Sequence, residues 1–193
     1  MIRFSTERLT LRTPVEDDLT AYLAYRNDPA ALAVQHLGPA TINEARTFLL
    51  DQAMRTESAP GWLMLAIVDK CAGRMLGETG VFRSPEQPDH GNIGWWLHPE
   101  FQGRGFATEA ARGLLHWCFG SLKLERVDAG CLVANTRSLR LMDRLGLRRN
   151  PGPGTREVDG ILHDEATFAI SREEWVDVHD ESQAAEVVSG GGS

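Results

Sequence analysis

A short turn with two glycines joins a stretch typical of a strand to a stretch typical of a helix. Its residues are Gln102, Gly103, Arg104, Gly105, Phe106, Ala107 and Thr108. Such a turn leaves backbone N–H groups without partners beside the positive end of the helix dipole, which suits an anion such as a pyrophosphate. The glycines allow unusual backbone angles, the alanine lets phosphates approach the backbone, and the arginine can add a charge-assisted contact. On spacing alone, a tight connection without a ligand explains the turn equally well.

The two commonest nucleotide-binding motifs do not fit this turn. A Walker loop requires Gly-Lys-Ser/Thr after four intervening residues, and a dinucleotide loop requires three glycines in the pattern GxGxxG. Here Gly103 and Gly105 are followed by Thr108 at the place of the third glycine. The loop therefore does not indicate a nucleotide-dependent kinase or dehydrogenase.

The elements that must position this turn follow from periodicity and turn residues. Strands are predicted at 8–12, 62–68, 75–82, 92–97, 127–133 and 163–170, and helices at 14–23, 43–55, 107–118 and 136–145. Gly146 is expected to close the last helix, and polar loops are expected around Pro85, Pro88 and Gly91 and at 151–154. This order is not a Rossmann alternation, and it predicts a mixed α/β sheet.

The turn also carries a family signature. Gln102-x-x-Gly105-x-Ala107 matches the Q/R-x-x-G-x-G/A signature of the GNAT acetyltransferase superfamily. Other segments resemble the branch that acetylates the N-termini of ribosomal proteins. They are the opening Ser5–Arg12, the strand Ile93–Leu97, the helix start Thr108–Ala110, the N-x-x-S element Asn135–Ser138, the L-G-F element Leu145–Leu147 and the H-D-x element His163–Glu165. Together these motifs are specific for the superfamily and much less so for any one substrate.

The resemblance implies a fold, a domain layout and a cosubstrate. The fold would be GNAT-like, with a mixed, mostly antiparallel central sheet of about seven strands flanked by about four helices. Residues 1–175 would form a single acyl-CoA N-acyltransferase domain, and residues 176–193 an acidic and then Gly/Ser-rich tail that is disordered. Acetyl-CoA would be the cosubstrate, with its pyrophosphate on the backbone amides of Gln102–Thr108. Its pantetheine arm would lie in a gap between two strands and pair with backbone near Leu97.

Two residues at the start of the helix predicted at 136–145 gain a role from the resemblance. Asn135 matches an asparagine that contacts the coenzyme arm, and Ser138 matches a serine placed near the thioester sulfur, where it could protonate the leaving thiolate. Each residue also has an ordinary structural interpretation. Asn135 would cap the helix that begins at Thr136, and the Ser138 hydroxyl would bond within its own helix.

The proton acceptor for the amine is where this sequence departs from the family. Many members carry a glutamate on the strand ahead of the loop, and the matching residue here is Asn92, which cannot take a proton. Glu78, His98 and Glu100 are within reach by sequence order, and Glu78 is the catalytic candidate that we retain. A water chain is the remaining alternative.

The acceptor expected from these features is a primary amine that attacks directly in a ternary complex. Attack requires a neutral amine, and a lysine with a pKa of about 10.4 costs about 4 kcal/mol to deprotonate near pH 7.4. An α-amino group with a pKa of about 7.7–8.0 costs under about 1 kcal/mol. A site without a strong base therefore favours α-amines, either a protein N-terminus or a small molecule.

The alternative function is a non-catalytic module that binds or senses acyl-CoA, and a measurement of turnover separates the two functions. The acyl-chain length and the oligomeric state, often a homodimer in this family, stay open.

Composition and charge narrow the partners. The 193 residues suffice for one domain, and 42% apolar with 24% charged residues is ordinary globular composition. One arginine and six acids in residues 172–186 account for −5 of the net charge of −7 and leave −2 for the rest, so no nucleic-acid partner is expected. Three cysteines without CxxC or nearby histidine spacing predict no metal. The sequence shows neither a signal peptide nor a membrane span, so a cytoplasmic location is expected.

Overall fold

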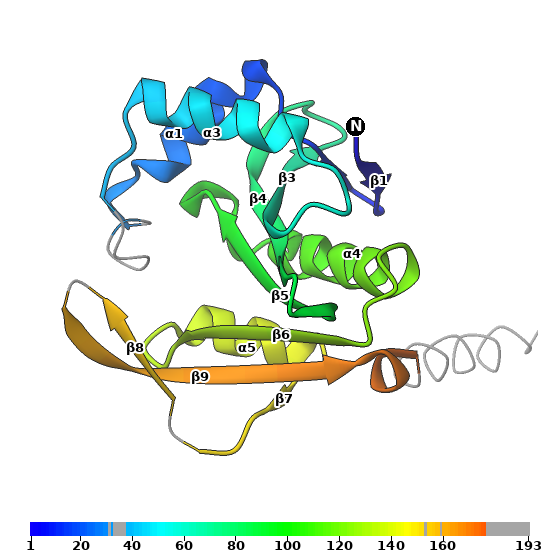
Figure 1. Ribbon diagram of the computed structural model, residues 1–193. Coiled ribbons are helices and arrows are strands. Elements are labelled where there is room, and N and C mark those ends of the chain that lie inside the picture. Colours follow the sequence, from blue (N-terminus) through cyan, green and yellow to red (C-terminus); the bar gives the residue numbers. More distant parts are fainter. Residues whose placement is uncertain (31, 33–37, 153, 159, 177–193) are drawn as a thin grey trace, which may run out of the picture.

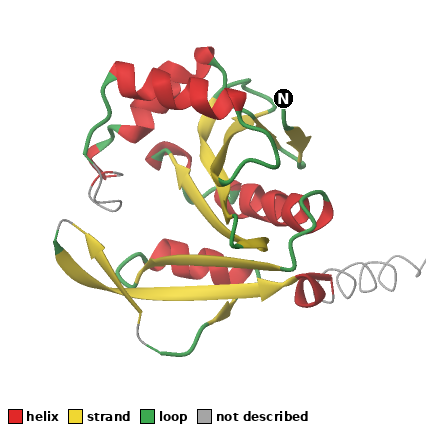
Figure 2. Ribbon diagram, viewed as in Figure 1, coloured by secondary structure: helices red, strands yellow, loops and turns green. Residues whose placement is uncertain are grey.

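One mixed sheet forms the centre of the structure, with helices on both of its faces (Figures 1 and 2). The computed structural model describes residues 1–30, 32, 38–152, 154–158 and 160–176. The strands are β1 (Arg3–Ser5), β2 (Leu9–Arg12), β3 (Gly61–Asp69), β4 (Met75–Ser84), β5 (Gln87–Leu97), β6 (Arg126–Leu132), β7 (Arg148–Arg149), β8 (Gly154–Val158) and β9 (Ile161–Ser171). The helices are α1 (Leu19–Arg26), α3 (Ile42–Met54), α4 (Phe106–Gly120) and α5 (Thr136–Arg144), with one-turn 3₁₀ helices at Glu16–Asp18 and Pro99–Phe101.

The strand order places one parallel pair in an otherwise antiparallel sheet. Within the described residues, nine strands follow the order β1-β2-β3-β4-β5-β6-β9-β7, and β8 pairs with β9 off this path. The parallel pair is β5 and β6, which are matched over only His90–Asn92 and Arg126–Asp128. Beyond these residues the two strands diverge, as Figure 1 shows. We call the gap between them the fork.

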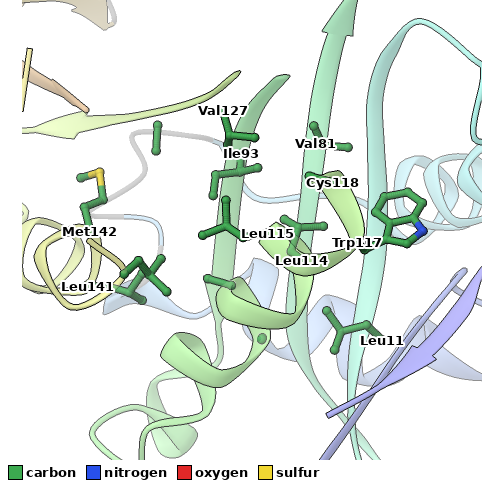
Figure 3. Close-up of a cluster of buried hydrophobic side chains, with 14 of the residues drawn as sticks. Leu11, Val81, Ile93, Leu114, Leu115, Trp117, Cys118, Val127, Leu141 and Met142 are labelled. Carbon is green, nitrogen blue, oxygen red and sulfur yellow. The ribbon is translucent and has the colours of Figure 1, made fainter. Parts of the chain in front are cut away.

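The side of the sheet that α4 covers holds the main core. Val81 of β4, Ile93 of β5 and Val127 of β6 point to that side and pack with Leu114 and Leu115 of α4 (Figure 3). All five side chains are at most 2% exposed. Because a slip of one residue would turn these side chains to the opposite face, their burial fixes the register of the strands beside the fork.

A second, smaller core lies between the opposite face of the sheet and the helices α1 and α3. Tyr22 and Tyr25 of α1 and Leu49 of α3 cluster there with Ala66 and Val68 of β3. The helix α1 also contacts β4. The last turn of α1 is thereby held over the face of the sheet that α4 leaves open.

A buried ion pair fixes where α1 begins. The carboxylate of Asp18 receives hydrogen bonds of 2.7 and 2.8 Å from the guanidinium of Arg12 and one of 2.8 Å from the backbone N–H of Val15. The side chains of Arg12 and Asp18 are 17% and 6% exposed. The pair ties β2 to the start of α1 and so holds this helix against the sheet.

Most of the predicted elements are confirmed. The predicted strands correspond to β2 to β6 and β9, and the predicted helices correspond to α1, α3, α4 and α5. Gly146 follows α5 with φ of 78°, as a C-terminal glycine cap requires. The helix expected from Pro14 instead begins with the 3₁₀ turn Glu16–Asp18 and continues as α1. The expected tail lies outside the described residues apart from Val176.

Other parts of the sheet differ from the sequence-based expectation. The sequence does not predict β1, β7 or β8, which bring the described sheet to nine strands. The loop expected around Pro85, Pro88 and Gly91 is confirmed at Pro85 and wrong at Pro88 and Gly91, because β4 and β5 form a tight hairpin there with Ser84 opposite Gln87. Pro88 has no partner residue in the register of β4. Its missing N–H therefore breaks no hydrogen bond of the ladder, as at the irregular positions where strands tolerate proline.

Replacing Arg12 tests the anchoring of α1. Arg12→Ala leaves the buried Asp18 carboxylate without its counter-ion, and we expect it to lower the free energy of unfolding by about 3–5 kcal/mol. Arg46→Ala is the matched control, since Arg46 and Glu16 form an ion pair at 3.5 Å with side chains 45% and 69% exposed. Such an exposed pair contributes under about 1 kcal/mol. Urea unfolding measures both, and equal losses would contradict the anchoring role of Arg12.

Candidate functional site

The predicted glycine turn has the geometry of an anion-binding loop. It follows the 3₁₀ turn Pro99–Phe101 and ends where α4 begins at Phe106. Gly103 and Gly105 have φ of 76° and 80°, which only glycine adopts without strain. Gly105 is the N-cap of α4 and supplies no side-chain acceptor, so no N-cap side chain pairs with the first-turn N–H groups. These donors and the positive end of a 15-residue helix are directed at one place.

Gln102 fixes the loop to the end of β5. Its side-chain amide donates a hydrogen bond of 2.9 Å to the carbonyl oxygen of Leu97. Its amide oxygen accepts a hydrogen bond from the guanidinium of Arg137 in α5. Gln102 therefore joins the strand, the loop and α5, and the carbonyl of Leu97 is already paired.

Arg8 is a second anchor of the loop, one that was not predicted from the sequence. Its Nε atom lies 2.6 Å from Oε2 of Glu109, and its Nη1 atom donates to the carbonyl oxygen of Arg104 at 3.1 Å. The guanidinium also lies 4.6 Å from the centroid of the Phe106 ring. Burial acts to raise the pKa of Glu109, but hydrogen bonds from Thr6 and Arg8 outweigh it and lower the pKa. Arg8 belongs to the opening segment that resembles the family, and this segment is the only signal that pointed to it.

The fork separates β5 and β6, and each of these strands carries a glycine on the face of the sheet opposite α4. Asn92 of β5 pairs with Asp128 of β6 at its closed end. Gly94 and Gly130 follow two residues later and point to the same face as this pair. A Cβ atom on Gly94 would lie 3.2 Å from Cη2 of Trp62, and one on Gly130 would lie 2.9 Å from Oε1 of Glu165. The two strands of the fork are thus covered by an indole ring on one side and a carboxylate on the other.

Glu78 lies on this same face, one strand from the fork. It is opposite Trp96 in the register of β4 and β5, and it is 7% exposed. Burial raises the pKa of Glu78 to about 7, opposed by the Tyr25 hydroxyl and the positive charge of Arg26. A carboxyl group with this pKa can gain and lose a proton near neutral pH.

The other two base candidates lie in the turn after β5. His98 accepts a hydrogen bond of 3.1 Å from the backbone N–H of Glu100 through its Nδ1 atom. Glu100 is exposed. Asn92 is also exposed, at the closed end of the fork. Of the three candidates, Glu78 alone is a buried carboxyl on the face of the sheet beside the fork.

The polar surroundings of Glu78 are incomplete within the described residues. The Tyr25 hydroxyl and the Nη1 atom of Arg26 are buried and make no hydrogen bond of normal length and angle. The guanidinium of Arg26 lies 4.5 Å from the centroid of the Trp96 ring. The Tyr25 hydroxyl interacts with the Glu78 carboxyl group, though not with normal hydrogen-bond geometry. A buried polar atom without a partner costs about 1–3 kcal/mol, so the Arg26 Nη1 atom is suited to water or substrate.

The helix α5 begins shortly after β6, the second strand of the fork. Asn135 caps this helix, with its Oδ1 atom accepting a hydrogen bond of 3.1 Å from the backbone N–H of Ser138. The capping interpretation of Asn135 is confirmed. The Ser138 side chain is half-buried, and its hydroxyl makes no hydrogen bond to another described residue. That hydroxyl is free to meet a ligand.

The thiols near the site are poorly suited to act as nucleophiles. Burial raises the pKa of Cys131 in β6 to about 11 and that of Cys118 in α4 to about 12. Both thiols therefore stay protonated near neutral pH, and the thiolate is the reactive form. Among the described residues, no group of three His, Cys, Asp or Glu side chains is placed to hold a metal ion. No described helix is long and apolar enough to cross a membrane.

Comparison with known proteins places the chain in a family. Residues 8–148 match the model of the acetyltransferase (GNAT) domain. The chain is 30% identical to the uncharacterized N-acetyltransferase p20 of Bacillus licheniformis over 82% of its length and 84% of that protein. It is 29% identical to the protein named "Putative ribosomal N-acetyltransferase YdaF" of Bacillus subtilis, over 53% of this chain and 57% of that one. A GNAT-family acetyltransferase from Bacillus anthracis has a similar structure, with a TM-score of 0.79, 25% identity and coverage of 90% and 100% of the two chains.

The chain belongs to the GNAT family of acetyltransferases. The predicted fold class is confirmed, as is the activity class, acetyl-CoA-dependent acetyltransferase. The resemblance to the branch that includes ribosomal-protein acetyltransferases is supported by the relatives of the chain.

The buried Glu78 makes stability depend on pH in a predictable direction. Its pKa is about 7 in the folded chain against an ordinary 4.5, so the folded state holds the proton more tightly. Stability is therefore lost as pH rises from about 4.5 through about 7, by on the order of 3 kcal/mol. Glu78→Gln should gain about that much relative to the parent between pH 5 and pH 8 in urea unfolding. The exposed Glu57→Gln should gain nothing, and a pH-independent effect of Glu78→Gln would contradict the burial of a titrating carboxyl.

Proposed function

We propose that the chain acetylates a primary α-amine, on a protein N-terminus or a small molecule, by direct attack on acetyl-CoA in a ternary complex. The observation that carries this proposal is an arrangement of three features. The N-terminus of α4 has no side-chain cap and lies at the mouth of the fork. The buried Glu78 lies on the face of the sheet beside the fork. The candidate anion site, the fork and Glu78 thus lie near the same end of β5. A turn that only connects a strand to a helix would need neither the fork nor a buried carboxyl group.

The coenzyme is assigned to the loop and the fork. Its pyrophosphate would accept hydrogen bonds from the backbone amides of Gln102–Thr108, with Arg104 adding charge. Its pantetheine arm would enter the fork past Leu97, where the diverging strands leave backbone groups of β5 unmatched by β6. Asn135 and Ser138 would contact the arm from the start of α5. The acetyl group, at the far end of the arm, would point toward the closed end of the fork at Asn92.

Each proton that leaves the acceptor nitrogen in the proposed reaction has a defined destination. The acceptor ammonium loses one proton, which reaches the Glu78 carboxylate through a chain of water, because Glu78 is opposite Trp96 and about 13 Å along the sheet from the closed end at Asn92. The amine nitrogen attacks the thioester carbonyl carbon, the C–N bond forms, and the C–S bond breaks. The second proton of the nitrogen ends on the sulfur of coenzyme A, relayed through the Ser138 hydroxyl. Direct attack is favoured because the buried Cys131 stays protonated and cannot carry the acetyl group.

The pKa of Glu78 favours α-amines as acceptors. A base with a pKa of about 7 takes a proton from an α-ammonium group, with a pKa of about 7.7–8.0, at a cost near 1 kcal/mol. The same transfer from a lysine, with a pKa of about 10.4, costs more than about 4 kcal/mol. One relative carries the name "Putative ribosomal N-acetyltransferase YdaF", and this name also favours a protein N-terminus as the acceptor. A non-catalytic acyl-CoA-binding module, which the absence of a carboxyl group at Asn92 would suit, predicts binding without turnover.

Coenzyme binding is tested by thermal unfolding with and without acetyl-CoA. At 100 times its dissociation constant, the ligand contributes about 2.7 kcal/mol and should raise the Tm by several degrees. Gly105→Glu places bulk and negative charge in the phosphate loop and should abolish the shift. Gly120→Glu adds the same charge at the other end of α4, where a Cβ meets no atom within 4 Å, and should keep the shift. No shift in the parent at millimolar acetyl-CoA would refute the site.

The role of Glu78 is tested by the pH dependence of turnover. For the parent, kcat/KM should rise with pH through about 7, as the Glu78 carboxyl loses its proton. Glu78→Gln should lower kcat by about 10²–10⁴ and remove this inflection, because proton transfer to a positioned base has that value. Glu100→Gln replaces the exposed rival carboxyl. A profile moved by Glu100→Gln and left intact by Glu78→Gln would reassign the base.

The acceptor class is tested with one peptide that carries both a free α-amine and an internal lysine. Mass spectrometry of the fragments locates the acetyl group. The difference of about 3 kcal/mol in proton cost corresponds to at least a hundredfold faster acetylation of the α-amine. Lysine acetylation at a comparable rate would contradict the α-amine proposal while leaving the acetyltransferase activity in place.

A further inference from the structure

A hollow of about 510 Å³ lies at the closed end of the fork. Trp62 at the start of β3 and Phe82 near the end of β4 form one side of it, and Asn92 and Asp128 form another. Asn92 and Asp128 are also the last matched pair before β5 and β6 diverge. The hollow therefore begins where the acetyl end of the coenzyme is proposed to lie.

The hollow shares a face of the sheet with Glu78. Phe82 is opposite Asn92, Gly80 is opposite Gly94, and Glu78 is opposite Trp96 in the register of β4 and β5. Steps of two residues keep all of these positions on one face. Along β4, about 13 Å separates Glu78 from Phe82 at a rise of about 3.3 Å per residue. Water molecules must therefore carry the proton from an amine at the closed end of the fork to Glu78.

Two large aromatic rings form an exposed platform in the hollow. Trp62 and Phe82 are 40% and 39% exposed, and their ring centroids are 5.7 Å apart. The indole lies across Gly94, since a Cβ atom there would be 3.2 and 3.5 Å from two of its ring carbons. Glycine at 94 thus lets the ring reach from β3 to β5. Paired aromatic rings left exposed on rigid strands, at the closed end of the fork, indicate a ligand surface rather than packing.

A carboxylate stands opposite this platform. Asp128 is 31% exposed, and both of its carboxylate oxygens accept hydrogen bonds from Arg126. Its Oδ1 atom accepts from Nη2 at 2.8 Å and from Nε at 3.2 Å, and its Oδ2 atom accepts from Nε at 3.3 Å. A carboxylate offers about four lone-pair sites, so these contacts leave acceptor capacity, chiefly on Oδ2. The amide of Asn92 adds a further acceptor and two donors beside it. An ammonium group would find its hydrogen-bond partners at this pair.

We propose that the hollow binds the acceptor, with the amine at Asn92 and Asp128 and an apolar, preferentially aromatic body against Trp62 and Phe82. The proposal rests on the function proposed above and names its substrate class: a primary α-amine with an aromatic group close to it. The order of groups follows from the fork, because the amine must meet the acetyl group at the closed end. The rest of the acceptor then extends over the aromatic platform.

The test compares L-phenylalaninamide with L-alaninamide as acceptors at saturating acetyl-CoA. The parent should show a kcat/KM about tenfold or more higher for L-phenylalaninamide, as contacts of this size in an apolar pocket give. Trp62→Ala should remove this preference through KM, and Trp62→Phe should restore most of it. Thermal unfolding of both variants checks that they are folded. A parent without the preference, or a preference intact in Trp62→Ala, overturns the aromatic platform.

Asp128→Asn tests the amine end of the hollow. The substitution keeps the shape and removes the charge, so KM should rise about tenfold or more for both amides alike. An unchanged KM overturns the assignment of the ammonium group to Asp128. Calorimetric titration of L-phenylalaninamide into the protein with coenzyme A bound separates this proposal from the proposed function. Binding that Trp62→Ala abolishes supports the hollow even without turnover, and absence of binding in the parent overturns it.

Discussion

The parallel pairing of β5 with β6 ends after three residues, and the rest of the site depends on that interruption. Two strands that pair at Asn92 and Asp128 and then diverge leave backbone N–H and C=O groups along both inner edges. Such groups require partners, and in the interior of a sheet only water or an extended ligand can supply them. The fork is therefore suited to an extended ligand that pairs with the free edges of β5 and β6.

The helices stabilise this open arrangement from both faces. On one face, α4 packs against β4 and β5 and directs its N-terminus at the mouth of the fork. Arg8 and Gln102 hold the loop that precedes α4, one from the N-terminal strands and the other from the end of β5. On the other face, the Arg12–Asp18 pair holds α1 over Glu78. The proposed phosphate site and the proposed proton acceptor are thus positioned by separate contacts.

The burial that suits Glu78 to the proposed role of base also costs stability. A buried carboxyl group with a pKa of about 7 is typical of functional sites. The Tyr25 hydroxyl and the Arg26 Nη1 atom near it make no hydrogen bond of normal length and angle to a described residue. Polar groups left incomplete in a core are costly for folding alone and are suited to a reaction that moves charge.

Local signals in the sequence were enough to predict the glycine turn and the helix that follows it. Two glycines at fixed spacing, a helical pattern after them and an asparagine at the start of α5 are features of single segments, and each was confirmed. The partners of Glu78 were not predictable, because its burial depends on α1, which is distant in sequence. Arg8 was missed for the same reason, since its partner Glu109 is 101 residues away.

The errors in the sheet have equally local causes. The strands β1 and β7 are three and two residues long, too short to show a period of two. The first half of β5 contains Pro88 and Gly91, which indicate a loop unless the hairpin register is known. The hollow beside Trp62 depends on which residues of three strands share a face, and that requires the register of the whole sheet.

Hydrogen exchange at the fork, followed by mass spectrometry with and without acetyl-CoA, tests the central claim most directly. If the coenzyme pairs with the open edge of β5 and with the N-terminus of α4, amides at 93–97 and 105–108 should exchange more slowly when it is bound. Amides of β2 and β3, which pair with neighbouring strands already, should be unaffected. Slowing at the fork and the loop together would support the account. Unchanged exchange at both segments under saturating acetyl-CoA would contradict it.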